Sequence, residues 1–258
     1  MQREGWRHEG PKGEGQAIRH RKITQKSRHA PPSDPTSPRQ LNLALGHRES
    51  FDRVDFLCGR GNETALALID RWTDWPARAI ALTGPEGSGK SHLAAIWAKA
   101  AGGRVIASHA IDAPSVPQAL SSGALAIEDA DRDELDEAAL FHLLNLAREQ
   151  SAHILITARQ APATWPIKLP DLASRLRALP VVALEPPDDA LLAAVLVKLF
   201  ADRQLAVDER LIEFLVHRIE RSFAAARAAV AELDHEAMRL KRPVNRALAA
   251  EILRGRTP

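Results

Sequence analysis

The pattern of apolar and polar positions changes along this chain. From about residue 51, short apolar runs of strand length alternate with segments in which apolar residues recur every three or four positions. This alternation is typical of a parallel α/β sheet whose faces are covered by helices. The expected strands are residues 78–83, 104–108, 125–128, 153–157 and 180–184. The sequence therefore predicts an α/β fold with a parallel five-stranded sheet and flanking helices.

The clearest helix in this region is expected between the third and the fourth strand. Its first turn is rich in carboxylates, which favour a helix N-terminus, and they are Asp133, Glu134, Asp136 and Glu137. Apolar side chains then recur at helical spacing, at Leu140, Leu143, Leu144 and Ala147. We expect this helix to cover one face of the sheet.

Beyond Pro186 and Pro187 no strand-like run follows. Residues 188–254 have the apolar spacing of three or four helices. The sequence therefore predicts an α/β domain at residues 51–186 and a small all-helical domain at residues 187–258.

The first 39 residues differ in composition from the rest of the chain. They are rich in Gly, Pro, Ser, Lys and Arg, so burial cannot compensate the entropy lost on ordering. They hold nine Lys or Arg and four Asp or Glu, whereas the remaining residues hold 26 and 29. We expect a disordered basic tail at residues 1–39, which either holds nucleic acid loosely, is simply solvated, or results from an upstream start codon. The mildly acidic remainder argues against a broad nucleic-acid surface on the folded part.

The sequence contains no long apolar run and one cysteine. No apolar run approaches the roughly 18 to 20 residues of a membrane span, and the first residues lack the apolar core of a secretory signal. We therefore expect a cytoplasmic protein with no membrane partner. The one cysteine, Cys58, excludes an intrachain disulfide and a multi-cysteine metal site, and we expect it to be a small buried residue.

Residues 84–91 match the G-x-x-x-x-G-K-[ST] pattern of a phosphate-binding loop (P-loop), whose backbone amides surround phosphate oxygens. The loop follows an apolar strand and opens a helix, whose positive dipole end points at the phosphates. In this pattern Lys90 neutralises the β- and γ-phosphates, and the Ser91 hydroxyl binds Mg²⁺. The expected nucleotide contacts are Gly84, Pro85, Glu86, Gly87, Ser88, Gly89, Lys90, Ser91 and His92.

A P-loop site also needs an acid at the end of a neighbouring strand. We interpret Glu128 as part of the metal shell and Asp129 as the residue that positions the attacking water, although the two acids could instead cap the following helix. Thr157 ends the fourth strand and would lie beside the γ-phosphate if that strand lies between the other two. Otherwise Thr157 has a structural role.

Residues 169–177 predict a short helix just before the last strand, with arginines at Arg175 and Arg177. An arginine there is either a solvated surface charge or a finger that projects into the nucleotide of a neighbouring subunit.

The order of these motifs resembles the AAA+ module of the bacterial replication initiator DnaA. The corresponding features are the P-loop, the paired acids, the polar strand end, Ser174-Arg175-Leu176, the phrase Leu184-Glu185-Pro186-Pro187 and a helical lid, within residues 51–253. The resemblance implies a P-loop AAA+ module that binds ADP or ATP with Mg²⁺. It also implies that the segment 55–62, which includes Phe56 and Leu57, lies against the adenine.

Two features distinguish this chain from the initiator. The initiator has a helix-turn-helix DNA-binding domain after its lid, whereas here the sequence ends at Pro258 directly after the expected lid. Residues 40–45 are similar to the peptides that dock on the bacterial sliding clamp. In such a peptide Gln40 is the polar anchor, and Leu41, Leu43 and Leu45 enter an apolar pocket. A leucine-rich hexapeptide could instead be a strand that packs on the core.

With both features, the chain resembles the Hda-type regulatory inactivators, a family of DnaA-like AAA+ proteins. The resemblance implies a protein that binds the sliding clamp, and DNA only indirectly through it. There it promotes hydrolysis of the ATP bound to a DnaA-type initiator and so negatively regulates replication initiation. Arg175 matches the arginine finger of this family, and the protein's own site would be an ADP-held switch with weak or no ATPase activity.

Two other functions stay open at this point. One is an autonomous ATPase that loads or remodels a replication partner. The other is an adaptor that the basic tail tethers to DNA or to a membrane. The sequence also leaves open whether the chain forms a homo-oligomer.

The chain departs from the family pattern at two places. The first acid of the pair is usually Asp, whereas Glu128 is longer by one methylene. The position of the lid arginine that senses nucleotide falls on Ala224, so either Arg221 or Arg227 substitutes for it or the contact is missing.

Overall fold

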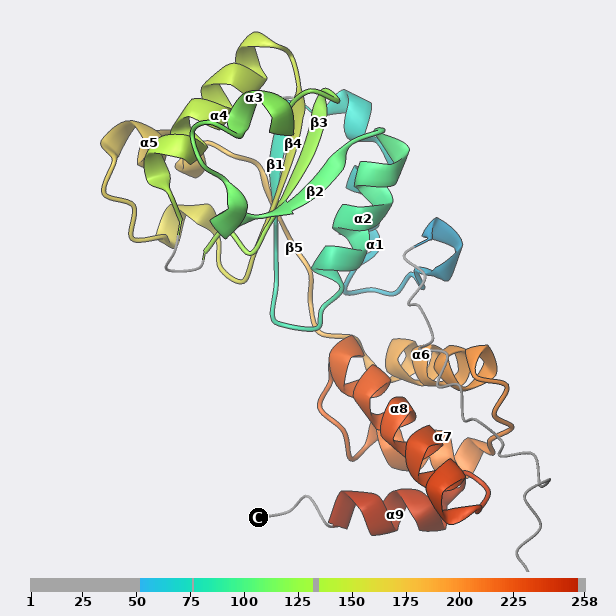
Figure 1. Cartoon of the computed structure of the whole chain (residues 1–258). Coiled ribbons are helices and arrows are strands. Elements are labelled where there is room, and N and C mark those ends of the chain that lie inside the picture. The colour runs from blue at the N-terminus through green and yellow to red at the C-terminus, as the bar shows by residue number, and fades with distance from the viewer. Residues whose placement is uncertain (1–51, 76, 132–134, 255–258) are drawn as a thin grey trace, which may run out of the picture. The chain divides into compact units, whose positions relative to one another are not determined.

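The computed structural model describes residues 52–75, 77–131 and 135–254 of the chain. Within these ranges one sheet contains β1 (Ala79–Thr83), β2 (Arg104–Ala107), β3 (Ala124–Glu128), β4 (His153–Ala158) and β5 (Val181–Ala183). The spatial order is β2-β3-β4-β1-β5, and every neighbouring pair is parallel (Figure 1). The predicted five-stranded parallel sheet is confirmed, and the strand ends differ from the predicted ones by at most one residue.

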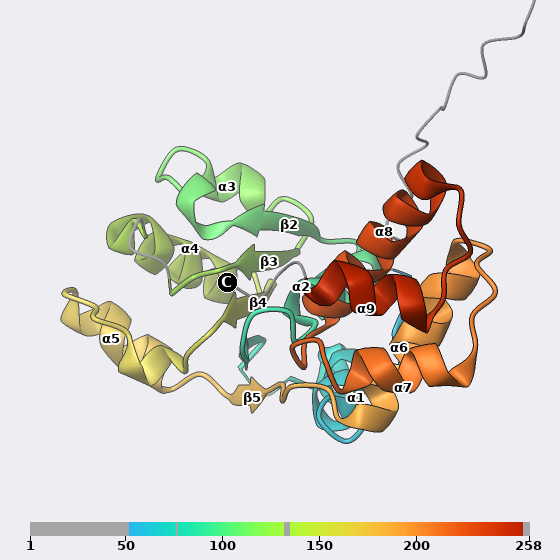
Figure 2. The ribbon, with the colours of Figure 1, turned by 90° about the horizontal axis from the view of Figure 1, so that it is seen from below.

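Helices cover both faces of this sheet (Figure 2). One face carries α1 (Glu63–Asp70) and α2 (Lys90–Ala100), and the other carries α3 (Val116–Ala119), α4 (Glu137–Glu149) and α5 (Pro170–Arg177). Successive strand residues point to opposite faces. Ala126 therefore packs in the core under α2, whereas Leu125 and Ile127 pack in the core under α4. Short 3₁₀ helices are η1 (Arg53–Asp55), η2 (Trp72–Asp74), η3 (Ser108–Ala110) and η4 (Pro162–Thr164).

Helix α4 is the helix expected between the third and the fourth strand. Its buried residues are Ala139, Leu140, Leu143, Leu144 and Ala147, which confirms the predicted core face. The helix begins at Glu137 because the Asp136 side chain accepts a hydrogen bond of 2.9 Å from the Ala139 amide. Asp136 is thus the N-cap and not a first-turn residue, and Asp133 and Glu134 lie outside the described residues.

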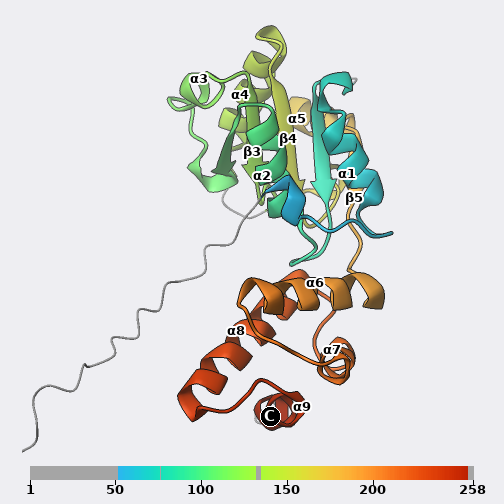
Figure 3. The same ribbon diagram turned by 90° about the vertical axis from the view of Figure 1, so that its right-hand side faces the viewer.

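After β5, the described chain forms α6 (Asp189–Asp202), α7 (Glu209–Val216), α8 (Phe223–Leu240) and α9 (Arg246–Arg254). These four helices, the lid, lie together in Figure 3. They share an apolar core that includes Leu192, Leu196, Leu211, Leu215, Val230 and Leu248. The side chains of Asp188, Asp208 and Ser222 cap α6, α7 and α8 by accepting an amide hydrogen bond in the first turn.

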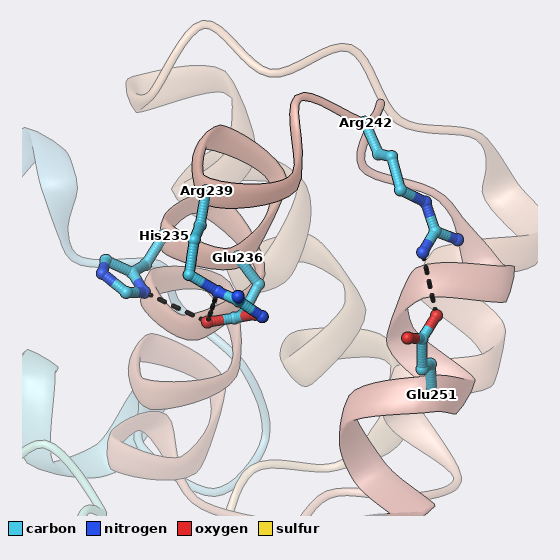
Figure 4. Close-up of polar contacts among 5 residues, drawn as sticks. All are labelled: His235, Glu236, Arg239, Arg242 and Glu251. Carbon is cyan, nitrogen blue, oxygen red and sulfur yellow. Dashed lines mark hydrogen bonds and ion pairs between the residues drawn. The ribbon is translucent and has the colours of Figure 1, made fainter. Parts of the chain in front are cut away.

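Charged side chains connect the last two lid helices at the surface (Figure 4). Arg239 and Glu236 form an ion pair of 2.6 Å within α8, and this guanidinium lowers the pKa of the Glu236 carboxyl. Arg242, just beyond α8, pairs with Glu251 of α9 at 2.9 Å. Exposed pairs of this kind contribute little stability, so the apolar core is what holds the lid together.

Candidate nucleotide-binding site

The P-loop lies at the carboxyl end of β1, where Gly84 follows the strand and Lys90 opens α2. Gly84, Gly87 and Gly89 all have positive φ angles, of 153°, 74° and 99°. A side chain at Gly84 would also bring its Cβ to 2.5 Å from the carbonyl oxygen of Leu184. The backbone of the loop therefore favours glycine at Gly84 and Gly89, the two positions that the motif fixes, and also at Gly87, which the motif leaves variable.

Lys90 reaches into this loop. Its side chain is buried, and Nζ donates hydrogen bonds to the carbonyl oxygens of Gly84 at 2.8 Å and Pro85 at 2.9 Å. Burial lowers the pKa of Lys90, and the carboxylates of Asp129 and Asp131 act against this shift. A cation thus lies inside the turn, at the N-terminus of α2, where a phosphate group would be favoured.

Two buried polar atoms at the carboxyl edge of the sheet lack hydrogen-bond partners among the described residues. They are Ser88 Oγ in the P-loop and Glu128 Oε1 at the end of β3. Buried polar atoms without partners are rare, so their presence at one edge fits a polar ligand there. A phosphate oxygen suits the Ser88 hydroxyl, and the water shell of Mg²⁺ suits the Glu128 carboxylate.

The described residues contain no group of three or more His, Cys, Asp or Glu side chains that could hold a metal ion. Mg²⁺ at a P-loop does not need such a group, because one or two protein ligands, phosphate oxygens and waters complete its octahedron. Ser91, which is exposed, and Glu128 therefore stay the predicted metal ligands.

Strand β4 lies between β1 and β3. Under this strand order Thr157 was expected to lie beside the γ-phosphate. Thr157 Oγ1 accepts a hydrogen bond of 3.2 Å from the Asp129 amide, and the Thr157 side chain is buried. Asp129 has a φ of 55°, which is uncommon outside glycine and is held here from both sides. On the other side, Ser108 Oγ donates to the Asp129 carbonyl at 2.8 Å. The structure thus brings Thr157 and Asp129 together at the P-loop edge.

The segment before α1 also lies against the P-loop. Phe56 is buried, its ring makes an edge-to-face contact with His92 at 5.2 Å, and it lies 3.6 Å from the position of a Cβ on Gly89. The Asn62 side chain orders this segment, because its amide donates to the Leu57 carbonyl at 3.0 Å. The sequence reasoning did not single out Asn62.

Cys58 is a correction to the sequence analysis. It is exposed, not buried, because the segment between η1 and α1 turns its thiol toward solvent while the neighbouring Phe56 packs inward.

The first turn of α8 meets the P-loop from the lid. The Phe223 amide donates to the Gly87 carbonyl at 2.9 Å. A Cβ on Gly87 would lie 2.9 Å from Ser222 Cβ and 3.1 Å from Ala224 Cβ. Ser222, Phe223 and Ala224 thus bring the lid against the loop, and Ala224 stands at the position where a lid arginine was expected. Arg221 forms an exposed ion pair of 2.8 Å with Asp189 of α6.

The sequence reasoning also missed Asp131 and Arg159. The Arg159 guanidinium forms an ion pair of 3.0 Å with Glu86 of the P-loop. Asp131 Oδ2 accepts hydrogen bonds from the amides of Arg159 at 2.8 Å and Gln160 at 3.1 Å. The signal that could have found Arg159 is its place two residues after Thr157, just past the end of a strand.

Arg175 lies elsewhere. It is half-buried on α5, and its guanidinium carbon lies 5.2 Å from the centre of the Phe141 ring. Together with Arg78 and Arg148 it lines a cleft of about 520 Å³ beside the residues that open β1 and β4. This is the amino edge of the sheet, whereas the P-loop follows the carboxyl end of β1.

The residues predicted to bind the sliding clamp lie outside the described ranges, and they are Gln40, Leu41, Leu43 and Leu45. The basic tail at residues 1–39 lies outside them as well. The clamp-binding interpretation and the disorder of the tail therefore stay predictions. None of the helices in the described ranges has the length and apolarity needed to cross a membrane.

Comparison with known proteins gives a fold but no family, because no protein-family model matches the chain. The chain is similar to domain III of the Thermotoga maritima replication initiation protein DnaA, with 19% identity, 80% of this chain and 96% of that chain covered, and a TM-score of 0.66.

Two further solved structures are similar to a lesser degree. For AMPPCP-bound DnaA from Aquifex aeolicus the identity is 18%, the coverage 74% and 66%, and the TM-score 0.56. The Thermotoga maritima RuvB Holliday junction branch migration motor has 17% identity and a TM-score of 0.58, with 75% of this chain and 68% of that chain covered. Likeness at this level of identity establishes the fold, which is that of a P-loop AAA+ module.

Proposed function

We propose that this protein is a nucleotide-binding regulator of replication initiation that promotes hydrolysis of the ATP bound to a DnaA-type initiator. In this proposal residues 40–45 hold the protein on a sliding clamp, where the protein meets the initiator. By promoting this hydrolysis the protein negatively regulates replication initiation. The observation that carries the proposal is the position of Arg175, at the edge of the sheet opposite to the chain's own P-loop.

The carboxyl edge of the sheet fits an adenine nucleotide with Mg²⁺. Lys90 and the backbone amides of the P-loop would hold the phosphates, while Ser91 and Glu128 would hold the metal ion. Phe56 and Leu57 border the place expected for the adenine. When bound, Mg²⁺ supplies positive charge that offsets the charge of the phosphates. The buried, unpartnered Ser88 Oγ and Glu128 Oε1 support this assignment.

Arg175 is out of reach of that nucleotide. Strand β1 has five residues, so its first and last Cα atoms are about 13 Å apart, four steps of roughly 3.3 Å. Arg175 lies beside one end and the P-loop follows the other. A guanidinium in this position suits a nucleotide that another protein presents to the amino edge. Arginine fingers stabilise charge that develops on the transferred phosphoryl group and are worth about 10³ to 10⁵ in rate.

The protein's own site is proposed to act as a switch with slow turnover. Ala224 faces Gly87 where an arginine would otherwise contribute a positive charge from the lid. Glu128 places its carboxylate one methylene further from the backbone than an aspartate would. Both features favour binding of a nucleotide over rapid hydrolysis.

The test is ATP hydrolysis by a purified DnaA-type initiator in the presence of this protein and clamp-loaded DNA. We expect Arg175→Ala to remove nearly all of the stimulation, because the charge in the transition state loses its guanidinium partner. Arg177→Ala is the matched control, since Arg177 is exposed on the same helix and its Nε donates to the Ala173 carbonyl at 3.1 Å. Nucleotide binding by the protein itself should be equal in the two variants.

Equal stimulation by the parent protein and by Arg175→Ala would sink the proposal. Stimulation that needs no clamp-loaded DNA would remove the clamp from the mechanism. Rapid ATP turnover by the isolated protein, lost in Lys90→Ala, would instead favour the autonomous ATPase.

A further inference from the structure

An exposed ion pair joins the P-loop to the end of the neighbouring strand. Arg159 Nη2 lies 3.0 Å from Glu86 Oε2, and the two residues come from the loop after β4 and from the P-loop itself. About half of the Arg159 side chain is exposed, and more than three quarters of the Glu86 side chain. An exposed pair of this kind contributes little stability by itself, so its role in holding the fold is small.

The backbone beneath Arg159 is held more firmly than its side chain. Asp131 Oδ2 accepts hydrogen bonds from two successive amides, those of Arg159 and Gln160. Strand β4 ends at Ala158, directly beside β1 and its P-loop. The Arg159 Cα is therefore fixed at the carboxyl edge of the sheet, whereas its guanidinium is free to exchange partners within its reach.

Hydrogen bonds show how near Arg159 is to the phosphate position. The Gly84 amide donates to the carbonyl oxygen of Ala158 at 3.2 Å, and Lys90 Nζ donates to the Gly84 carbonyl at 2.8 Å. Arg159 directly follows Ala158 in the chain. Its Cα therefore lies next to the loop that holds the ammonium group expected to bind the β- and γ-phosphates.

The lid position at which an arginine was expected holds none. Ala224 occupies the position at Gly87, and Arg221 is paired with Asp189. A triphosphate carries about one negative charge more than a diphosphate at neutral pH. Distinguishing the two requires a cation that reaches the terminal phosphate, and Arg159 approaches the P-loop from the sheet side.

We propose that Arg159 is the residue by which this protein distinguishes ATP from ADP, exchanging Glu86 for the terminal phosphate. The inference rests on the proposed nucleotide site and adds a sensor to it. With a diphosphate the guanidinium stays on Glu86, which neutralises a carboxylate that would repel phosphate. With a triphosphate the guanidinium fork matches the phosphate oxygens, a stronger interaction than an exposed carboxylate offers.

The experiment measures dissociation constants of the full chain for ATP and ADP, both with Mg²⁺, by isothermal titration calorimetry. Arg159→Ala should weaken ATP binding roughly tenfold to a hundredfold, the range of a hydrogen bond to a charged group, and leave ADP binding nearly unchanged. Arg159→Lys should restore part of the preference. Glu86→Gln should strengthen ATP binding relative to ADP, because the guanidinium loses its competing partner.

Arg221→Ala is the matched control, since Arg221 is also an exposed arginine in an ion pair near the P-loop. It should leave the ratio of the two affinities unchanged. The inference is overturned if Arg159→Ala leaves that ratio unchanged, or if Arg221→Ala shifts it instead. If the parent chain binds neither nucleotide, the proposed nucleotide site fails together with the sensor. A different outcome separates the two proposals. If the protein does not stimulate ATP hydrolysis by the initiator, but Arg159→Ala still changes the ratio of the ATP and ADP affinities, the proposed function is wrong and the sensor is supported.

Discussion

At the scale of single residues, Gly87 is the point at which the P-loop and the lid meet. Its φ of 74° is accessible to glycine at no steric cost, and the absence of a Cβ lets Ser222 and Ala224 approach. The Gly87 carbonyl accepts the amide hydrogen of Phe223. One small residue thus lets the first turn of α8 lie directly on the loop that would hold the phosphates.

We expect Gly87→Ala to destabilise the protein by more than its backbone strain. The positive φ alone costs about 1 kcal/mol, and the clash with Ser222 adds about 1 kcal/mol or more by forcing α8 away. Urea unfolding measures the total, and hydrogen exchange at the Phe223 amide reports the lost contact with the loop. The control is Gly102→Ala, because Gly102 has a φ of 64° but nothing within 4 Å of its Cβ position. An equal loss of unfolding free energy in Gly87→Ala and Gly102→Ala would argue against a stabilising contact between Gly87 and α8.

At the scale of elements, β4 links the core to the site. All six of its residues are buried, and its central place in the sheet puts Thr157 beside Asp129. At the other end of the strand, the His153 ring makes an edge-to-face contact with Trp72 at 4.9 Å. Burial lowers the pKa of His153 below its ordinary value of 6.5, and Arg78 lowers it further.

This shift predicts acid sensitivity. As the pH falls below about 6.5, the unfolded chain binds a proton at His153 that the folded protein does not, so stability falls with pH. His153→Phe should therefore lose less stability than the parent protein between pH 7 and pH 5, and the difference cannot exceed about 1.4 kcal/mol per pH unit. Urea unfolding at each pH gives these values. His142→Asn, at an exposed histidine on α4, is measured beside it as the control for removing a histidine. Identical profiles for the parent protein and His153→Phe would exclude His153 as the cause.

At the scale of the whole molecule, the sheet has two chemically different edges. The P-loop, Asp129 and Arg159 lie at its carboxyl edge, whereas Arg175 lies at its amino edge. Because rigid strands separate them, one nucleotide cannot contact both. This arrangement suits a protein that holds its own nucleotide and acts on that of a partner, and the proposed clamp peptide would bring the two proteins together on DNA.

The clamp peptide has its own prediction. Gln40→Ala combined with Leu43→Ala should weaken binding of the full chain to a purified sliding clamp by roughly 30-fold or more, because an anchor residue contributes about 2 kcal/mol. Asn42→Ala lies between these anchors and should change the affinity little. Isothermal titration calorimetry gives both values, and an unchanged affinity of the double variant would show that residues 40–45 are not the anchor.

The sequence by itself determined the kind of each element and the chemistry of the P-loop. Apolar periodicity is a local property, so the strand ends could be predicted to within one residue, as for β1, and the buried face of α4 could be predicted as well. The start of α4 was predicted too early, because acidic residues before a helix resemble those of its first turn. The glycines of residues 84–91 were equally readable, because the backbone of that loop needs them wherever it occurs.

Only the tertiary structure decided which residues meet. Glu86 and Arg159 are 73 positions apart, and no local pattern pairs them. Strand order placed Thr157 beside Asp129, packing of the lid placed Ala224 on Gly87, and the direction of β1 placed Arg175 away from the P-loop. Contacts of this kind depend on how several elements pack against one another, which the periodicity of a single segment does not contain.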